Sequence, residues 1–135
     1  MTINPVKPFV KTLKAYSVHK APKGIQYVQI SAHSSIEPVE VDYVPVEKAS
    51  NIEGHVHSKS NALCCILEGS GIVVLGSKRV KIRKNDVVNI PAGTWHEFFA
   101  SDKENLVFLS IQYPPIGDDY IFENDRLQQP LKAKK

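Results

Sequence analysis

Two histidines separated by one residue, in the stretch Gly54-His55-Val56-His57, are the side chains of this chain best suited to metal chemistry. Side chains alternate between the two faces of a β-strand, so His55 and His57 share a face if this stretch is extended. Imidazole is the commonest protein ligand for first-row transition metals, and such a pair can chelate an ion once a third ligand arrives. The alternative is two ordinary histidines on a solvated or buried strand.

A second stretch, DVVNIPAGTWHEF at residues 86–98, offers the third ligand. A Pro-Ala-Gly turn at residues 91–93 separates two β-rich segments, and His96 opens the second of them. We expect this turn to direct His96 back across a barrel toward the earlier pair. A site formed by His55, His57 and His96 is therefore the main hypothesis.

Together the two stretches resemble the paired motifs of the cupin superfamily. The residues that match are His55, His57 and Gly69 in the first motif, and Pro91, Gly93 and His96 in the second. The resemblance covers about residues 40–113. It implies an all-β fold, the cupin double-stranded β-helix or jelly-roll barrel, with a metal ion held by the three histidines. It implies much less about function, because one fold hosts many unrelated activities.

One departure from the family motif bears directly on the metal site. The motif often carries a metal-binding glutamate seven residues before its second glycine, and here that position is Ala62. With the shorter spacing after His57 the position becomes Asn61, whose amide oxygen would be a weak fourth ligand. We favour the Ala62 register, because it needs no gap before the following turn. The motif also changes at Asn85, where glycine is usual, and at Ala100, where asparagine is usual.

Three neutral nitrogen ligands suit a divalent transition metal, namely Fe, Zn, Ni or Cu, and suit Mg²⁺ or Ca²⁺ poorly. The identity of the metal stays open at this point. A metal with open coordination positions can polarise a bound carbonyl group or activate water or dioxygen.

Four further residues are candidates for the wall of the same pocket. Phe98 shares the face of His96, and Cys64 shares the face of Ala62 in a regular strand. Ser110 and Gln112 are polar residues on one face of the otherwise apolar segment LVFLSIQY, so they are candidate substrate contacts. No carboxylate, lysine or tyrosine inside the motifs stands out as a general base, so the catalytic residue is unknown.

Short β-rich segments separated by Gly, Pro, Asn or Asp must position these residues. Helical periodicity is scarce, and the spacing of the segments predicts an all-β sandwich or barrel of about eight to ten strands. The expected strands are Ile25–Ile30, Val39–Val46, Gly54–His57, Ala62–Leu67, Gly71–Leu75, Arg79–Ile82, Asp86–Ile90, His96–Ala100 and Leu106–Tyr113.

Length and composition predict one domain in this chain of 135 residues, with 42% hydrophobic and 23% charged residues. We expect an extended N-terminal arm at residues 1–24, a single barrel domain at residues 25–123 and a flexible basic tail at residues 124–135. The net charge is only +3, and three lysines lie in the last four positions, so we expect neither nucleic-acid nor membrane binding. The adjacent Cys64 and Cys65 suit two reduced thiols, which favours a cytoplasmic location.

Three functional hypotheses follow. The first is an enzyme with a mononuclear three-histidine metal centre that acts on a small molecule, either dioxygenase-like or an isomerase or lyase for a sugar or small acid. The second is a non-catalytic module that binds a small molecule or a metal. The third is a structural dimer, which retention of all three histidines argues against. The resemblance implies a homodimer, and the proline-rich arm could add a strand to a neighbour's sheet.

Overall fold

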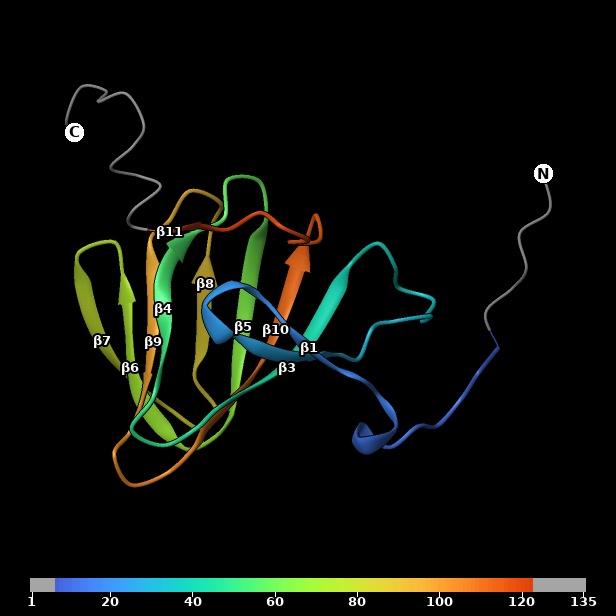
Figure 1. Ribbon diagram of the computed structural model, residues 1–135, viewed down its shortest axis with the longest axis horizontal. Helices are drawn as coiled ribbons and strands as arrows, with labels where there is room; N and C mark the ends of the chain where they lie inside the picture. Colours follow the sequence, from blue (N-terminus) through green and yellow to red (C-terminus); the bar gives the residue numbers. More distant parts are fainter. Residues whose placement is uncertain (1–6, 123–135) are drawn as a thin grey trace.

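Two antiparallel sheets form the fold of the computed structural model, which describes residues 7–122 (Figure 1). One sheet has six strands in the order β1-β2-β3-β10-β5-β8, and the other has five in the order β11-β4-β9-β6-β7. The strands are β1 Val18–Lys20, β2 Gln26–Gln29, β3 Glu40–Val46, β4 Asn51–Val56, β5 Asn61–Glu68, β6 Ser70–Leu75, β7 Lys78–Arg83, β8 Val87–Ile90, β9 His96–Ala100, β10 Leu106–Tyr113 and β11 Ile121–Phe122. This arrangement confirms the predicted all-β jelly-roll barrel.

The inner faces of the two sheets pack together around an apolar core. Alternation along the strands supplies it: in β10 the buried side chains include Leu106, Phe108, Ser110 and Gln112. Phe108 stacks on Phe98 of β9 with ring centroids 4.4 Å apart, which joins the two sheets at the centre of the barrel. Aromatic pairs of this kind add about 0.5–1.5 kcal/mol to the free energy gained by burying their area.

Each of the nine expected strands corresponds to a strand of the structure, with ends that differ by a few residues. Two strands, β1 and β11, were not predicted, because three and two residues are too few to give a periodic signal. The only helical segments among residues 7–122 are two turns of 3₁₀ helix, Leu13–Ala15 and Pro22–Gly24. Neither has the length or the apolar character needed to cross a membrane.

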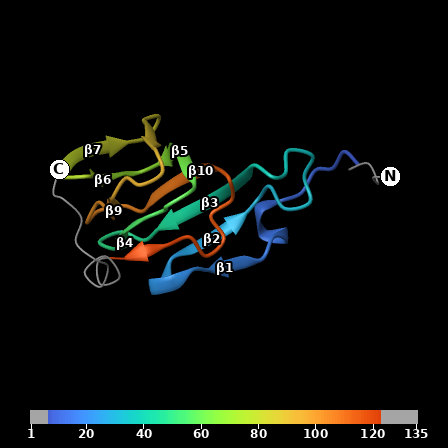
Figure 2. The ribbon, with the colours of Figure 1, turned by 90° about the horizontal axis from the view of Figure 1, so that it is seen from above.

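Part of the expected N-terminal arm lies within the fold. Strand β1 pairs antiparallel with β2 of the same chain, with Val18 opposite Val28 and Lys20 opposite Gln26. Strand β1 thus extends the six-stranded sheet of its own chain beyond β2. Residues 7–17 extend from β1 away from the barrel (Figure 2). The expected tail at residues 124–135 lies outside the described residues.

Candidate metal centre

An irregularity in β4 turns both histidines of the first motif toward the barrel interior. Ile52 pairs with Phe98 and His55 pairs with His96 on β9, and the register shifts between these two pairs. In a regular strand Ile52 and His55 would face opposite sides, yet both are buried. Gly54 lies at this irregularity, and a β-carbon there would overlap the Trp95 ring. The missing side chain of Gly54 therefore lets the strand turn without a clash.

The turn before β9 fixes the position of His96 relative to His57. The Thr94 N–H donates to the Pro91 carbonyl oxygen at 3.1 Å, and the Gly93 N–H donates to the His57 carbonyl oxygen at 2.8 Å. Gly93 has a φ of +85°, a conformation that glycine adopts without strain. The turn thus ties the end of β4 to the start of β9, as the Pro-x-Gly spacing predicted.

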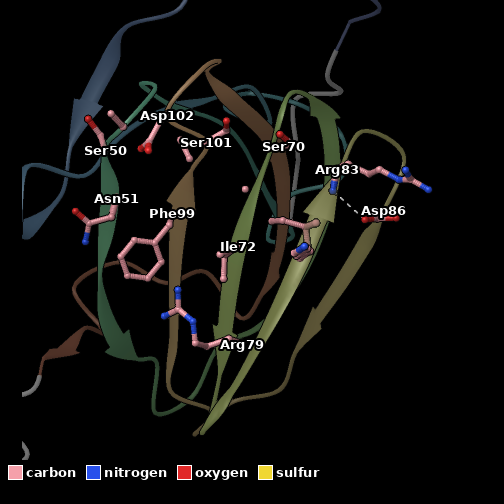
Figure 3. A pocket seen from close by; sticks show the side chains of 15 residues that line it. Ser50, Asn51, Ser70, Ile72, Arg79, Arg83, Asp86, Phe99, Ser101 and Asp102 are labelled. Atoms are coloured by element: carbon pink, nitrogen blue, oxygen red, sulfur yellow. Dashed lines mark hydrogen bonds between the residues drawn. The ribbon is translucent and has the colours of Figure 1, made fainter.

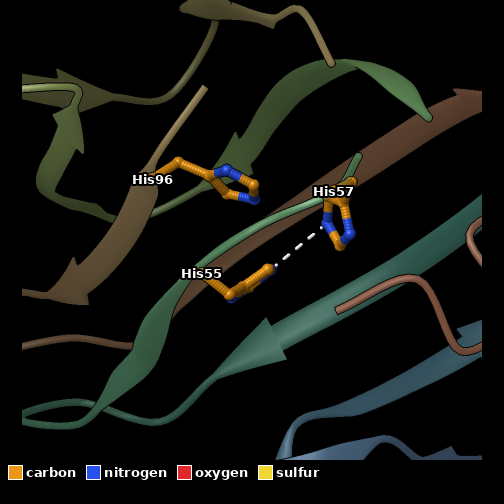
Figure 4. Close-up of side chains that lie close together, drawn as sticks. All are labelled: His55, His57 and His96. Atoms are coloured by element: carbon orange, nitrogen blue, oxygen red, sulfur yellow. Dashed lines mark hydrogen bonds between the residues drawn. The ribbon is translucent and has the colours of Figure 1, made fainter. Parts of the chain in front are cut away.

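The three histidine rings converge on one space from two neighbouring strands (Figure 4). Their nearest ligand atoms all lie within 4.8 Å of one another, and the Nε2 atoms of His55 and His57 are 3.2 Å apart. Two nitrogen ligands of one metal ion, each about 2.0–2.1 Å from it, lie about 2.9–3.4 Å apart in octahedral or tetrahedral geometry. The spacing of His55 and His57 fits this range.

Backbone carbonyl groups fix the tautomer of every ring in the cluster. The Nδ1 atom of His55 lies 2.7 Å from the Glu53 oxygen, that of His57 lies 2.6 Å from the Asp119 oxygen, and that of His96 lies 2.9 Å from the Thr94 oxygen. A carbonyl oxygen only accepts, so each Nδ1 carries the hydrogen and each neutral ring presents a bare Nε2 lone pair. Such bonds orient metal-binding histidines in proteins.

The Nε2 atoms of His55 and His57 lie as close together as two ligands of one cation. With both Nδ1 atoms protonated, two neutral rings bring two lone pairs together, which is repulsive. Burial lowers the pKa of His55 to about 4 and also lowers the pKa of His57, so protonating either ring to relieve the repulsion is unfavourable. Burial likewise lowers the pKa of His96, to about 3. The neutral imidazole is the form that binds metals, so the donor set suits a transition-metal ion.

The histidines form one wall of a cavity of about 50 Å³ between the two sheets. All four expected pocket residues line this cavity: Cys64, Phe98, Ser110 and Gln112. Burial raises the pKa of Cys64 to about 12, so this thiol stays neutral and is not a reactive nucleophile. Among the His, Cys, Asp and Glu residues that the structure describes, the three histidines are the ones close enough together to hold an ion.

Asn61 does not lie in the cavity, which corrects the expectation of a weak fourth ligand at this position. Its side chain is exposed, its Oδ1 accepts a hydrogen bond from the Ala92 N–H at 3.0 Å, and its Nδ2 donates to the Tyr113 oxygen. Ala62, one residue along β5, points inward and lines the cavity. Alternation along the strand therefore places the apolar residue, and not the amide, opposite the histidines.

Several residues of the site carried no motif signal in the sequence. Asp42 of β3 lines the cavity together with Tyr27 and Tyr120. The Tyr120 ring lies 5.1 Å from the His55 ring and 4.9 Å from the His57 ring, which places it against the histidines. Burial alternates along EVDYVPV, so Glu40 and Asp42 share the inner face, but no residue pattern in this segment indicates that Asp42 lies in the cavity of the histidines.

A larger groove of about 1010 Å³ lies on the outer face of the five-stranded sheet (Figure 3). Ile72, Phe99 and Arg79 line it, and the Arg79 guanidinium lies 5.6 Å from the centre of the Phe99 ring. None of the three histidines lines this groove. The metal-binding chemistry of the described residues is therefore confined to the inner cavity.

Known proteins share this fold. A cupin-2 domain protein of Rhodospirillum rubrum superimposes with a TM-score of 0.72 at 20% identity, covering 92% of this chain and 88% of the other. A predicted oxalate decarboxylase of Thermotoga maritima gives a TM-score of 0.67 at 17% identity, covering 77% and 97%. At these identities the likeness concerns the fold.

Sequence similarity extends to an uncharacterised protein of Methanocaldococcus jannaschii, 33% identical over 65 residues. The match covers 48% of this chain and spans about half of that relative, 52% of its length. The family model described as the cupin domain matches residues 43–112, a segment that contains β4, β9 and all three histidines. Because this match covers more than half of the chain, the chain belongs to the cupin domain family.

Proposed function

We propose that this protein is a metal-dependent enzyme that acts on a small molecule at a mononuclear centre held by His55, His57 and His96. The observation that carries the proposal is the convergence of three Nε2 lone pairs whose Nδ1 atoms are all held by backbone carbonyl oxygens. A neutral donor set of this kind favours Fe, Zn, Ni or Cu. The metal would polarise an oxygen-bearing substrate or activate water or dioxygen.

The chain's own residues would position and shield the substrate. Phe98 and Phe108 line the cavity, Tyr120 packs against two of the histidines, and the three histidines are buried. Exclusion of water strengthens every electrostatic interaction within a site. A reaction of the dioxygenase, isomerase or lyase type on a small acid is consistent with this arrangement, whereas a sugar is too large for a cavity of about 50 Å³.

Metal analysis of untagged protein tests the proposal. We expect near-stoichiometric transition metal in the wild type and its loss in the His57→Ala and His96→Ala variants. His19→Ala is the matched control, since His19 is an exposed histidine on β1. Metal content that both site substitutions leave unchanged would rule out the three-histidine centre.

A non-catalytic binding module is the second candidate function. The observation that favours it is the alanine at position 62, where the family motif often has a metal-binding carboxylate. Oxygen consumption and product formation by the metal-loaded protein, followed against a panel of diols, thiols and sugar acids, separate the two. Turnover that disappears in His96→Ala supports the enzyme, whereas saturable binding without turnover supports the module.

We also propose that the protein forms a homodimer through its N-terminal segment. Phe9, Val10, Leu13 and Val18 are large apolar residues that this segment exposes, with Phe9 52% and Val18 60% exposed. Exposed apolar clusters mark interaction sites, and a second copy would bury them. Sedimentation should give a dimer at micromolar concentration, and Phe9→Asp should shift it toward monomer. A wild-type monomer under these conditions would contradict the proposal.

The thiols support a cytoplasmic location, which remains part of the proposal. Cys64 and Cys65 are both free, and reduced thiols are usual in reducing compartments. Fractionation of cells that express the untagged protein tests this, and recovery outside the cytoplasm would contradict it.

A further inference from the structure

A polar wall faces the histidines from the opposite sheet. It consists of Asp42 on β3 and of Ser110 and Gln112 on β10, which are 4%, 6% and 2% exposed. Asp42 and Ser110 are direct neighbours across the two strands. Burying a carboxyl group and an amide inside an apolar barrel is unfavourable unless their polar atoms find partners.

Two hydrogen-bond acceptors in this wall take no part in its internal hydrogen bonds. The Gln112 Nε2 donates to Asp42 Oδ2 at 2.9 Å and to Ser110 Oγ at 2.9 Å, which uses both amide hydrogens. Asp42 Oδ1 and Gln112 Oε1 are buried without a hydrogen-bond partner. No lysine or arginine lines the cavity to neutralise them. A buried oxygen atom without a partner in the protein calls for one from outside the chain, such as a water molecule or a polar group of a ligand.

The size of the cavity limits what can bind there. Its volume is about 50 Å³, and a water-sized group needs about 10–15 Å³ on this measure. The space therefore admits about three to five non-hydrogen atoms. In a ligand this small, only a few covalent bonds separate the oxygen atom that binds the metal from the group that contacts the polar wall.

We propose that Asp42 and Gln112 form a hydroxyl-binding subsite, so that the ligand of the centre is a small hydroxylated compound such as a 2-hydroxy acid or a 1,2-diol. The proposal rests on the proposed function, since the other end of the ligand would bind the metal. A hydroxyl group donates to Gln112 Oε1 or to Asp42 Oδ1 and can also accept from a protonated Asp42. A second carboxylate on the ligand would meet the unpartnered Gln112 Oε1, which only accepts, and is disfavoured there.

The electrostatics of Asp42 suit a group that exchanges a proton with such a hydroxyl. Burial and the neighbouring Glu40 carboxyl raise the pKa of Asp42 to about 8, although the Gln112 hydrogen bond lowers it. A cation at the histidines would act in the opposite direction, because a nearby positive charge favours the ionised carboxylate. The titratable groups around it are Glu40 on the same strand, Tyr27 on β2, Tyr120 before β11 and the three histidines.

Ligand binding to the cobalt-loaded protein tests the subsite, with the visible absorption of Co²⁺ as the readout. The probes are glycolate and fluoroacetate, two small acids of similar size of which only glycolate carries a hydroxyl group. We expect the wild type to bind glycolate at least about tenfold more tightly, the value of one hydrogen bond to a charged group. Asp42→Asn should reduce this preference at least about fivefold while the cobalt content stays unchanged.

Two further variants keep the outcome decisive. Asp102→Asn, at an exposed aspartate, is the matched control and should keep the wild-type preference. If Asp42→Asn does not fold, Asp42→Ser replaces it, because its smaller neutral hydroxyl can still accept from Gln112. A glycolate preference that survives in the Asp42 variant would overturn the subsite. Failure to bind cobalt at all would instead count against the three-histidine centre.

Discussion

The Nδ1 atom of His57 donates to the backbone carbonyl oxygen of Asp119 at 2.6 Å, across 62 positions of the chain. The Asp119 carboxylate meanwhile accepts hydrogen bonds from the loop that follows His57. Its partners are the Ser58 N–H and hydroxyl and the Lys59 N–H, each at 2.8 Å, and the Ser60 N–H at 3.3 Å. One residue thus orients a candidate ligand and fastens the loop beside it.

Asp119→Ala should therefore weaken both the fold and the metal centre. Removing the carboxylate leaves three N–H groups of the loop to water, and we expect a loss of about 1–2 kcal/mol in the free energy of unfolding. The substitution keeps the Asp119 carbonyl group but removes the carboxylate that fastens the loop after His57, so the carbonyl oxygen is held less firmly against His57 Nδ1 and metal affinity should fall about tenfold. Denaturant titration and metal competition with a chelator measure the two effects.

The neighbouring Asp118→Ala is the matched control, because Asp118 is exposed and should affect neither quantity. Although partial burial raises the pKa of Asp119, the hydrogen bonds donated by Lys59 and Ser58 lower it to about 2. Its stabilising effect is thus present above pH 3.8 and is lost as the pH falls toward about 2. An Asp119→Ala defect that persisted unchanged at pH 2 would contradict this account.

The barrel and its histidines could be predicted from the sequence because both depend on local signals. Alternation and turn residues mark the strands, and the Pro-x-Gly turn places His96 opposite His55. Asp42 and Asp119 could not be found in this way. Their roles arise from pairing between segments far apart in the chain, such as Asp42 beside Ser110, and no short-range pattern encodes such a register.

The same limit explains the ambiguity between Asn61 and Ala62. Spacing alone allowed either residue to take the fourth-ligand position. The pairing of Ala62 with Ile90 and with Gln112 decides it, because it fixes which side chains of β5 face the barrel. The irregularity at Gly54 was equally hidden, since a regular strand would also have placed His55 and His57 on one face.

Acid should destabilise the metal-free protein through its buried histidines. Burial lowers the pKa of His96 from 6.5 to about 3, so the unfolded chain takes up this proton first. The contribution of neutral His96 to stability is therefore full above pH 6.5 and is lost as the pH falls toward about 3. Thermal unfolding of the wild type and of His96→Gln between pH 7 and pH 5 should show the smaller pH dependence in the variant. Identical slopes would contradict the prediction, and His19→Ala should retain the wild-type slope.

Asp42 should have the opposite effect on the stability of the metal-free protein. Burial and the neighbouring Glu40 carboxyl raise its pKa from 3.8 to about 8, so the folded chain holds this proton more tightly than the unfolded chain. Its contribution is full below pH 3.8 and is lost as the pH rises through about 8. Asp42→Asn does not titrate, so its melting temperature should rise relative to the wild type between pH 5 and pH 8. A difference that stays constant over this range would refute the shifted pKa, and Asp102→Asn controls for the lost surface charge.

Ala62→Glu should convert the three-histidine centre into a four-ligand site. Ala62 lines the cavity opposite the histidines, so a glutamate there would bring a carboxylate to the open side of the metal. We expect metal affinity to rise at least about tenfold, because an anionic ligand adds charge as well as a bond. The metal-free variant should lose about 2 kcal/mol or more, since its carboxylate is buried without a partner. Melting temperatures with and without metal should therefore diverge far more than in the wild type.

Asn61→Glu is the matched control, because Asn61 is exposed and directed away from the cavity. Equal gains in metal affinity from both substitutions would show that β5 does not present Ala62 to the centre.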